Sequence, residues 1–256
     1  MVLPHAGVLN LDNGELAWLS DPSGELALAD VQRADAGGRF TPLYGSLTRG
    51  YTTDVHWLRL QVDNRGESAR YYLELMPPFL DDLQLYEVLP DGSVRRHLDG
   101  DRSRVSQRDF HLPSPLFRLE LPPGRTTLYL RVQTTSSSVV LATFFDAPSL
   151  QQRLTTQGVL YGAYFGVLGV VLLLNLINWR LLGDPTFGIY ASYLVAQLAY
   201  FAASYGIVTQ YFFPELPVVG DRLVGISLGG MVVTGLLFFQ RLLGIDRSRA
   251  VVVATV

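Results

Sequence analysis

The sequence predicts an all-β head of the sandwich or jelly-roll type, followed by an α-helical membrane bundle. Of its 43 Arg, Asp and Glu residues, 34 lie within residues 1–153 and nine lie in the remaining 103. Leu154–Trp179 contains no charged residue, and this run of 26 exceeds the roughly 20 residues that a helix needs to cross a bilayer. The chain therefore divides into a water-soluble domain and a membrane domain.

The head begins with a segment that is rich in turn-forming residues. Gly, Asp, Ser and Pro recur throughout residues 1–50, which we expect to form a loop-rich lead-in with one short helix near Leu28–Arg33. From Val55 onward, apolar and polar residues alternate with period two, which indicates strands. The clearest alternating stretches are His56–Asp63, Tyr71–Met76, Leu83–Tyr86, Phe117–Leu121, Leu128–Gln133 and Ser138–Phe145.

Turn signals separate these strands, as at Pro90–Gly92 and Pro122–Gly124. About eight short strands with no strong helix between them fit an antiparallel sandwich, with a jelly roll as the candidate topology. We expect the sandwich over residues 51–147 and a linker over 148–156. Residues 157–256 then hold three transmembrane helices and the start of a fourth.

The membrane part contains two further uncharged runs, Pro185–Pro214 and Leu223–Gln240, and its last residues, Ala250–Val256, begin another apolar stretch. The absence of carboxylates and His inside the runs counts against an ion-coupled transporter. Glycines at intervals of four suit close helix packing, which makes a homodimer through the membrane helices a candidate arrangement. These glycines are Gly158, Gly162 and Gly166. Asn175 and Asn178 share one helix face and are expected to hydrogen-bond a neighbouring helix.

The orientation follows from arginines in the short loops, because an excess of Arg marks the cytoplasmic side. Four arginines flank one side (Arg180, Arg241, Arg247 and Arg249) and two flank the other (Arg153 and Arg222), which places the head outside the cytoplasm. Met1–Asn10 has neither the basic start nor the apolar core of a signal peptide. We therefore expect the sequence to be part of a longer protein.

Composition excludes several kinds of chemistry. A net charge of −3 gives no case for a nucleic-acid partner, and without Cys there is neither a disulfide nor a thiolate nucleophile. The four His residues lack metal-ligand spacing, so we expect no metal site and no cofactor. Gly225–Gly229 matches G-x-S-x-G but lies in an apolar run instead of a strand–turn–helix. No residue is therefore predicted to be catalytic.

One set of polar residues on the head is a candidate binding surface. Arg and Tyr side chains interleave on the polar side of three predicted strands and could form a shallow groove for a carboxylate or a sugar. The alternative is an ordinary solvated sheet face. The predicted ligand-binding residues are Arg59, Gln61, Tyr86, Tyr129 and Arg131.

The order of these features resembles the bacterial seven-transmembrane receptors with diverse intracellular signalling modules. The resemblance to their type-2 extracellular sensing domain lies in Leu19–Val31, Phe40–Tyr51, His56–Asn64, Leu80–Tyr86 and Thr127–Val132. The stretches that resemble their seven-helix domain are Leu173–Trp179, Tyr190–Tyr200 and Gly206–Pro214. The resemblance implies a jelly-roll head similar to carbohydrate-binding modules, seven spans in the bacterial inner membrane, and a cytoplasmic histidine kinase or diguanylate cyclase.

These observations predict the input portion of a membrane signalling receptor. Its head would lie on the periplasmic or extracellular side and bind a small molecule, with a carbohydrate as the candidate class. Two alternatives remain open. One is a transport component whose head captures substrate. The other is a membrane-anchored carbohydrate-active enzyme, which needs two carboxylates facing each other at about 5–10 Å in one cleft; Glu74, Glu87 and Glu120 are available.

Overall fold

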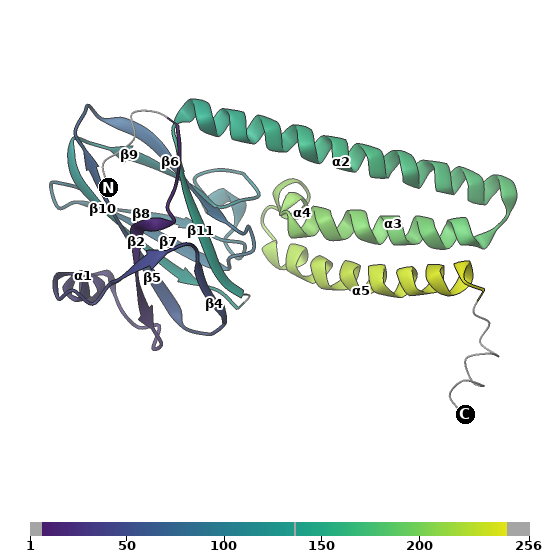
Figure 1. Ribbon diagram of the computed structural model, residues 1–256, viewed down its shortest axis with the longest axis horizontal. Helices are drawn as coiled ribbons and strands as arrows, with labels where there is room; N and C mark the ends of the chain where they lie inside the picture. The colour runs from purple at the N-terminus through teal and green to yellow at the C-terminus, as the bar shows by residue number, and fades with distance from the viewer. Residues whose placement is uncertain (1–6, 136, 245–256) are drawn as a thin grey trace. The chain divides into compact units, whose positions relative to one another are not determined.

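The computed structural model describes residues 7–135 and 137–244, which divide into two units (Figure 1). The first unit, the head, comprises residues up to Leu154 together with Tyr205–Val218. The second, the membrane unit, comprises Thr155–Ser204 and the residues from Val219 onward. Each unit is described by itself.

The head is a sandwich of two antiparallel sheets, which confirms the predicted fold class. The larger sheet has the order β3-β2-β5-β10-β7-β8, and the smaller has the order β1-β11-β6-β9, with β4 also pairing β11. The larger sheet consists of β3 (Thr41–Tyr44), β2 (Asn13–Asp21), β5 (Val55–Asn64), β10 (Gly124–Gln133), β7 (Asp82–Val88) and β8 (Val94–Asp99). The smaller consists of β1 (Val8–Asn10), β11 (Ser137–Phe145), β6 (Ala69–Met76), β9 (Leu116–Leu121) and β4 (Leu47–Tyr51).

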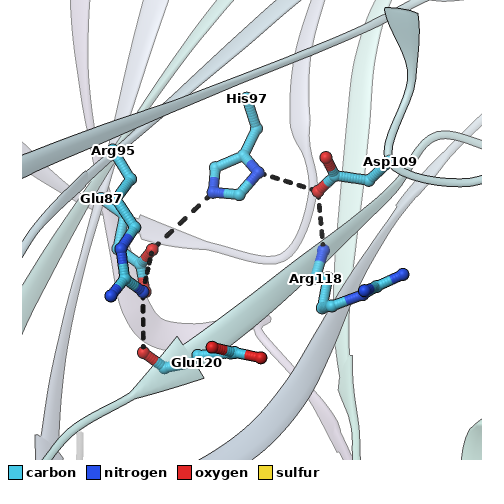
Figure 2. Close-up of a pocket in the computed structure, with 6 residues that line it drawn as sticks. All are labelled: Glu87, Arg95, His97, Asp109, Arg118 and Glu120. Atoms are coloured by element: carbon cyan, nitrogen blue, oxygen red, sulfur yellow. Dashed lines mark hydrogen bonds and ion pairs between the residues drawn. The ribbon is translucent and has the colours of Figure 1, made fainter. Parts of the chain in front are cut away.

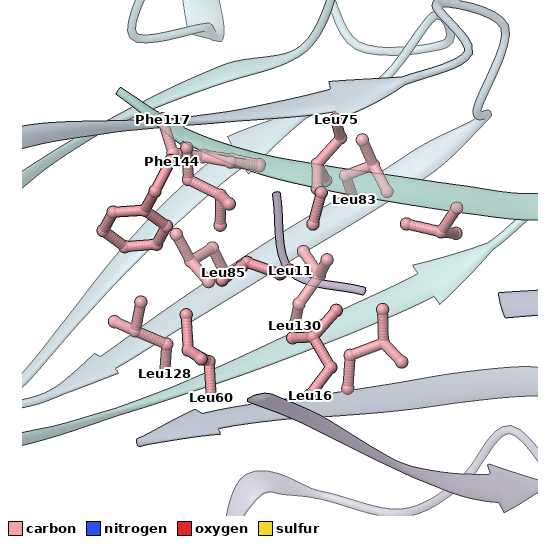
Figure 3. Packing of buried hydrophobic residues seen from close by; sticks show 14 of the residues in the cluster. Leu11, Leu16, Leu60, Leu75, Leu83, Leu85, Phe117, Leu128, Leu130 and Phe144 are labelled. Atoms are coloured by element: carbon pink, nitrogen blue, oxygen red, sulfur yellow. The ribbon is translucent and has the colours of Figure 1, made fainter. Parts of the chain in front are cut away.

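The core lies between the two sheets because each strand points its alternate apolar residues inward. On β5 these residues are Leu58, Leu60 and Val62, all at most 3 % exposed. They belong to one buried cluster with Leu75 of β6 and Phe117 of β9, on the opposite sheet; Figure 3 labels Leu60, Leu75 and Phe117. The alternation read from the sequence thus corresponds to the real inward face.

The first fifty residues differ from expectation. They contain four strands where loops were predicted, although the predicted helix is present as α1 (Leu28–Ala36). In β2, Leu16–Leu19 is a continuous apolar run without polar alternation, and Gly14 and Asp21 near its ends favoured a loop interpretation. The strand β8 was also missed, because its sequence VRRHLD has no apolar alternation.

Within the described part of the chain, three helices are long and apolar enough to cross a bilayer: α2 (Ala147–Leu182), α3 (Pro185–Ser204) and α5 (Pro217–Leu242). The second predicted run is divided, because α3 ends at Ser204 and a short helix, α4 (Ile207–Tyr211), follows Gly206, whose φ is +71°. The predicted start of a fourth span lies outside the described residues.

The helix α2 differs in two respects from what the sequence suggested. It begins at Ala147, so residues 148–156, which were expected to form a linker, are helical. The position of the boundary between the two domains stays a prediction. Asn175 donates its side-chain N–H to the Val171 carbonyl of its own helix at 2.8 Å, instead of to a neighbouring helix. A Cβ on Gly158, Gly162 or Gly166 would meet no atom of another described helix within 4 Å, so the packing seam also stays a prediction.

Candidate functional site

The five predicted ligand-binding residues lie together on the outer face of the larger sheet. Their strands are neighbours, with Tyr129 of β10 directly between Arg59 of β5 and Tyr86 of β7. Gln61 lies opposite Thr127, and Arg131 lies opposite Gln84, on the same face. Alternation within single strands could not establish that these three strands are neighbours; the register of the sheet does.

Helix α1 occupies part of this face. Its Asp35 forms an ion pair with Arg59 and accepts a hydrogen bond from the Tyr129 hydroxyl at 2.7 Å. Burial, and then the Asp35 carboxylate, raise the pKa of Tyr129, which is only 5 % exposed. Val31 and Ala34 of α1 belong to the same buried cluster as Tyr129. Arg59 and Tyr129 thus fasten α1 to the sheet.

The other members of the predicted set remain partly accessible. Tyr86 stacks on Trp57 with ring centroids 5.9 Å apart, and its hydroxyl donates to Gln84 at 3.0 Å. Arg131 donates to Gln133 at 3.0 Å. The accessible part of the face therefore combines an aromatic ring with amide and guanidinium groups. That this face binds a ligand stays a prediction.

A second candidate site lies at an open side of the sandwich, between the edge strands β8 and β9. Asp99 at the end of β8 accepts a hydrogen bond at 3.1 Å from the backbone N–H of Leu116, the first residue of β9. Beside this junction lies a cleft of about 340 Å³, shown in Figure 2. We call it the edge cleft; it is lined by Glu87, Arg95, His97, Asp109, Arg118 and Glu120.

Glu87 on β7 forms the buried part of the edge cleft. Its side chain is 1 % exposed, and its carboxylate lies 3.7 Å from Nε2 of His97 and 3.6 Å from the Arg95 guanidinium. These are ion pairs at distances beyond normal hydrogen bonding. Neither Glu87 oxygen, nor the His97 Nε2, has a hydrogen-bond partner within the described part of the chain. Burying a carboxylate in this way is unfavourable, so the arrangement calls for an explanation.

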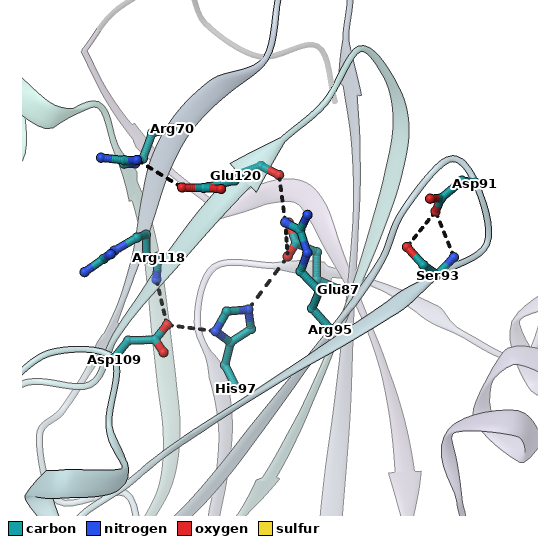
Figure 4. Close-up of polar contacts among 9 residues, drawn as sticks. All are labelled: Arg70, Glu87, Asp91, Ser93, Arg95, His97, Asp109, Arg118 and Glu120. Carbon is teal, nitrogen blue, oxygen red and sulfur yellow. Dashed lines mark hydrogen bonds and ion pairs between the residues drawn. The ribbon is translucent and has the colours of Figure 1, made fainter.

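His97 is held from its other side by Asp109, in the loop between β8 and β9. The His97 Nδ1 lies 2.8 Å from the Asp109 carboxylate, which also accepts the backbone N–H of Arg118 at 3.1 Å (Figure 4). The Asp109 hydrogen bond, and then Glu87, raise the pKa of His97 to about 9. Burial raises the pKa of Asp109, but the His97 and Arg118 hydrogen bonds outweigh it and lower the pKa overall. At neutral pH the imidazole is therefore a cation.

The rim of the edge cleft carries the remaining charges. The Arg118 guanidinium lies over the Phe110 ring, 4.9 Å from its centroid, and Glu120 pairs with Arg70 at 3.0 Å. With His97 protonated, the six lining residues comprise three cations and three anions. The edge cleft thus presents both donors and acceptors but no net charge.

Sequence reasoning did not identify the edge cleft, although it named Glu87 and Glu120 as available carboxylates. The third, Glu74, lies apart and pairs with Arg153 at 3.6 Å. One signal was present: Glu87 follows Leu83 and Leu85 in the inward-pointing phase of β7, where a charge is unusual. The other lining residues come from separate elements, and alternation does not reveal that β8 and β9 adjoin.

A folded β-sandwich head joined to apolar helices of membrane length defines a membrane protein with a large water-soluble domain. Family models match nearly the whole chain: the 7TMR-DISM extracellular 2 domain over residues 13–146 and the 7TM diverse intracellular signalling domain over residues 157–256. The chain therefore belongs to the seven-transmembrane receptors with diverse intracellular signalling modules. The matched domains are sensory and not catalytic, and they identify a membrane sensor.

Comparison with curated proteins finds no match to this sequence. Among solved structures, TmCBM61 in complex with β-1,4-galactotriose is 10 % identical, with a TM-score of 0.29, covering 54 % of this chain and 85 % of that one. An exo-β-1,3-galactanase from Phanerochaete chrysosporium with galactose is 12 % identical, with a TM-score of 0.27, covering 56 % of this chain and 29 % of that one. Superpositions this loose do not locate a binding site on the present head.

Proposed function

We propose that this chain is the input portion of a bacterial signalling receptor. The head binds a small ligand outside the inner membrane, with a carbohydrate as the candidate class, and the helices pass the change to a cytoplasmic kinase or cyclase module. A ligand can do this only if its affinity differs between two states of the receptor. The proposal needs a site on the head and a path from the head to the membrane.

One observation carries this proposal: a sensory head and a receptor-type membrane domain of one family occur in a single chain, and α2 belongs to both. Its first turns are packed into the head, where Leu150 is 6 % exposed beside Leu116 and Phe145. From there the helix continues without interruption to Leu182. A change in the packing around Leu150 would therefore act directly on a membrane-spanning helix.

A ligand screen by thermal unfolding tests the function. Trp18 and Trp57 belong to the head, so a Trp179→Phe variant of the full chain in nanodiscs reports head unfolding by tryptophan fluorescence. We expect a member of a panel of sugars, carboxylates and calcium to raise the melting temperature by roughly 5 °C at a hundredfold excess over Kd. A head whose melting temperature responds to none of these compounds would contradict the proposed function.

Variants then assign the binding surface. Loss of the shift in Arg131→Ala would support the predicted sheet face, because Arg131 is not part of the contact with α1. Arg59→Ala is a poorer probe, since it also removes the partner of Asp35. Retention of the shift in Arg131→Ala, with loss in edge-cleft variants, would move the ligand to the second site.

A further inference from the structure

We infer that the edge cleft is a binding site for a neutral, hydroxyl-bearing molecule, one of whose hydroxyl groups lies beside both Glu87 and His97 and hydrogen-bonds to each. This inference rests on the proposed function, because it names the chemical class and the residues of a ligand for the head. The edge cleft lies apart from the outer face of the larger sheet, and its residues differ from the five predicted ones. Its own chemistry indicates the class of ligand.

Two buried groups in the edge cleft, Glu87 and His97, have hydrogen-bonding capacity that no described residue satisfies. Glu87, 1 % exposed at its side chain, offers two acceptor oxygens with no hydrogen-bond donor among the described residues. His97 has its Nδ1 committed to Asp109, which leaves the Nε2–H as a donor without an acceptor. The two groups face each other at 3.7 Å, so a group placed beside both could satisfy both.

The charges around Glu87 and His97 determine which ligand group can bind beside them. A ligand ammonium would meet the Glu87 carboxylate but also the cationic His97 and Arg95. A ligand carboxylate would meet those cations but also Glu87 at close range, and like charges in a poorly solvated site repel strongly. A hydroxyl group both accepts and donates, so it takes the His97 N–H and gives its own hydrogen to Glu87 without adding charge. The chemistry therefore favours a neutral hydroxylic ligand.

The edge cleft is large enough for a small molecule and carries further polar groups at its rim. A volume of about 340 Å³ is far larger than the share of one water molecule, and it falls at the lower end of the range for small-molecule pockets. Arg95 adds a guanidinium donor at the rim, whereas the Arg118 guanidinium lies over Phe110 and the Glu120 carboxylate pairs with Arg70. Several hydroxyl groups on one small molecule would thus find partners of both kinds, as a polyol or a sugar provides.

Binding should also depend on the proton of His97. When that proton is lost, Nε2 becomes an acceptor facing the Glu87 acceptors, and the hydroxyl group can no longer satisfy both. The charged groups facing His97 are Glu87 and Arg95 on β7 and β8, Asp109 in the following loop, and Arg118 and Glu120 on β9.

The test is isothermal titration of the full chain in nanodiscs with neutral pentoses, hexoses and polyols, and with the corresponding uronic acids and amino sugars. We expect at least one neutral compound to bind in preference to its charged counterparts. Glu87→Gln and His97→Gln should each weaken that binding at least tenfold, whereas Glu67→Gln, at an exposed position outside the cleft, should leave it unchanged. Affinity should fall about tenfold as pH rises from 8 to 10.

Three results would overturn the inference: only charged compounds bind, no compound binds, or binding persists in both variants. Tryptophan fluorescence in the Trp179→Phe background establishes whether each variant is folded, and Arg95→Ala at the exposed rim offers a second variant that keeps the buried pair. A compound whose binding is lost in Arg131→Ala but kept in Glu87→Gln would refute the edge cleft and leave the proposed function standing. A head that binds no compound of any class would count against both.

Discussion

At the scale of single residues, the head uses its buried charges in two distinct ways. Asp35 ties Arg59 and Tyr129 to α1, and Asp99 ties β8 to β9 through the Leu116 N–H, so these carboxylates fasten elements together. Glu87 fastens nothing by a hydrogen bond in the described structure. Asp35 and Asp99 accept hydrogen bonds, whereas Glu87 accepts none from the described residues. This difference marks the edge cleft as a candidate binding site.

His97 leads to a prediction about pH. Its pKa is about 9 in the folded head against 6.5 in the unfolded chain, so folding favours the protonated form. The resulting stabilisation is complete below pH 6.5 and is lost as pH rises through 9. We expect the free energy of unfolding of the head to fall by roughly 1–3 kcal/mol across this window, allowing for the open side of the cleft.

Urea unfolding followed by tryptophan fluorescence in the Trp179→Phe background measures this change. His97→Gln should be less stable than the parent at pH 6.5 and should show little further loss up to pH 9. An equal slope in both proteins would mean that His97 is not the titrating group.

At the scale of elements, the first turns of α2 belong to the head. Asp146 accepts the backbone N–H of Ser149 at 2.9 Å, as an N-terminal cap does, and so starts the helix where β11 ends. Leu150 then packs into a cluster with Leu116 and Phe145, to which Phe110 also contributes. Phe110 directly follows Asp109, the partner of His97, so the same loop touches the edge cleft and the start of α2.

We expect Leu150→Ala to lower the free energy of unfolding of the head by about 2–3 kcal/mol, because it leaves a cavity in a small buried cluster. Gln152→Ala, on the exposed side of the same turn, should change it by less than about 0.5 kcal/mol. Urea unfolding of the head measures both. Equal stabilities of the two variants would show that the first turns of α2 do not pack on the sandwich.

A strand could be predicted when its own sequence alternates between apolar, inward-facing residues and polar, outward-facing ones. The alternation from His56 to Asp63 identified β5, and the same reasoning located β6, β9, β10 and β11. It failed for β8, an edge strand whose outer positions are charged. The edge cleft could not be predicted, because Glu87, His97 and Asp109 lie on two strands and a loop, and which edges meet depends on pairing between sheets.

At the scale of the whole molecule, membership of a sensor family and the continuity of α2 favour a receptor that transmits through a helix. With a rise of 1.5 Å per residue, the 36 residues of α2 extend about 54 Å, enough to cover both its packed first turns and a bilayer. A continuous helix transmits rotation and displacement better than a flexible linker would.

The orientation of the chain can be tested with cysteine labelling, because the sequence contains no Cys. We expect Arg104→Cys in the head to react with a membrane-impermeant maleimide in intact bacterial cells. Leu182→Cys, at the end of α2 beside Arg180, should react only after the inner membrane is permeabilised, because loop arginines favour the cytoplasmic side. The reverse labelling pattern would place the head in the cytoplasm and contradict the proposed function.

The open side of the sandwich has one more consequence, for behaviour at high concentration. An edge strand with free backbone groups can pair with the edge of another molecule and start aggregation. On β8 and β9 the exposed positions carry Arg95, Arg96, Arg118 and Glu120, and like charges would be brought together by such pairing. The charges on these two edge strands thus disfavour strand pairing between copies of the head.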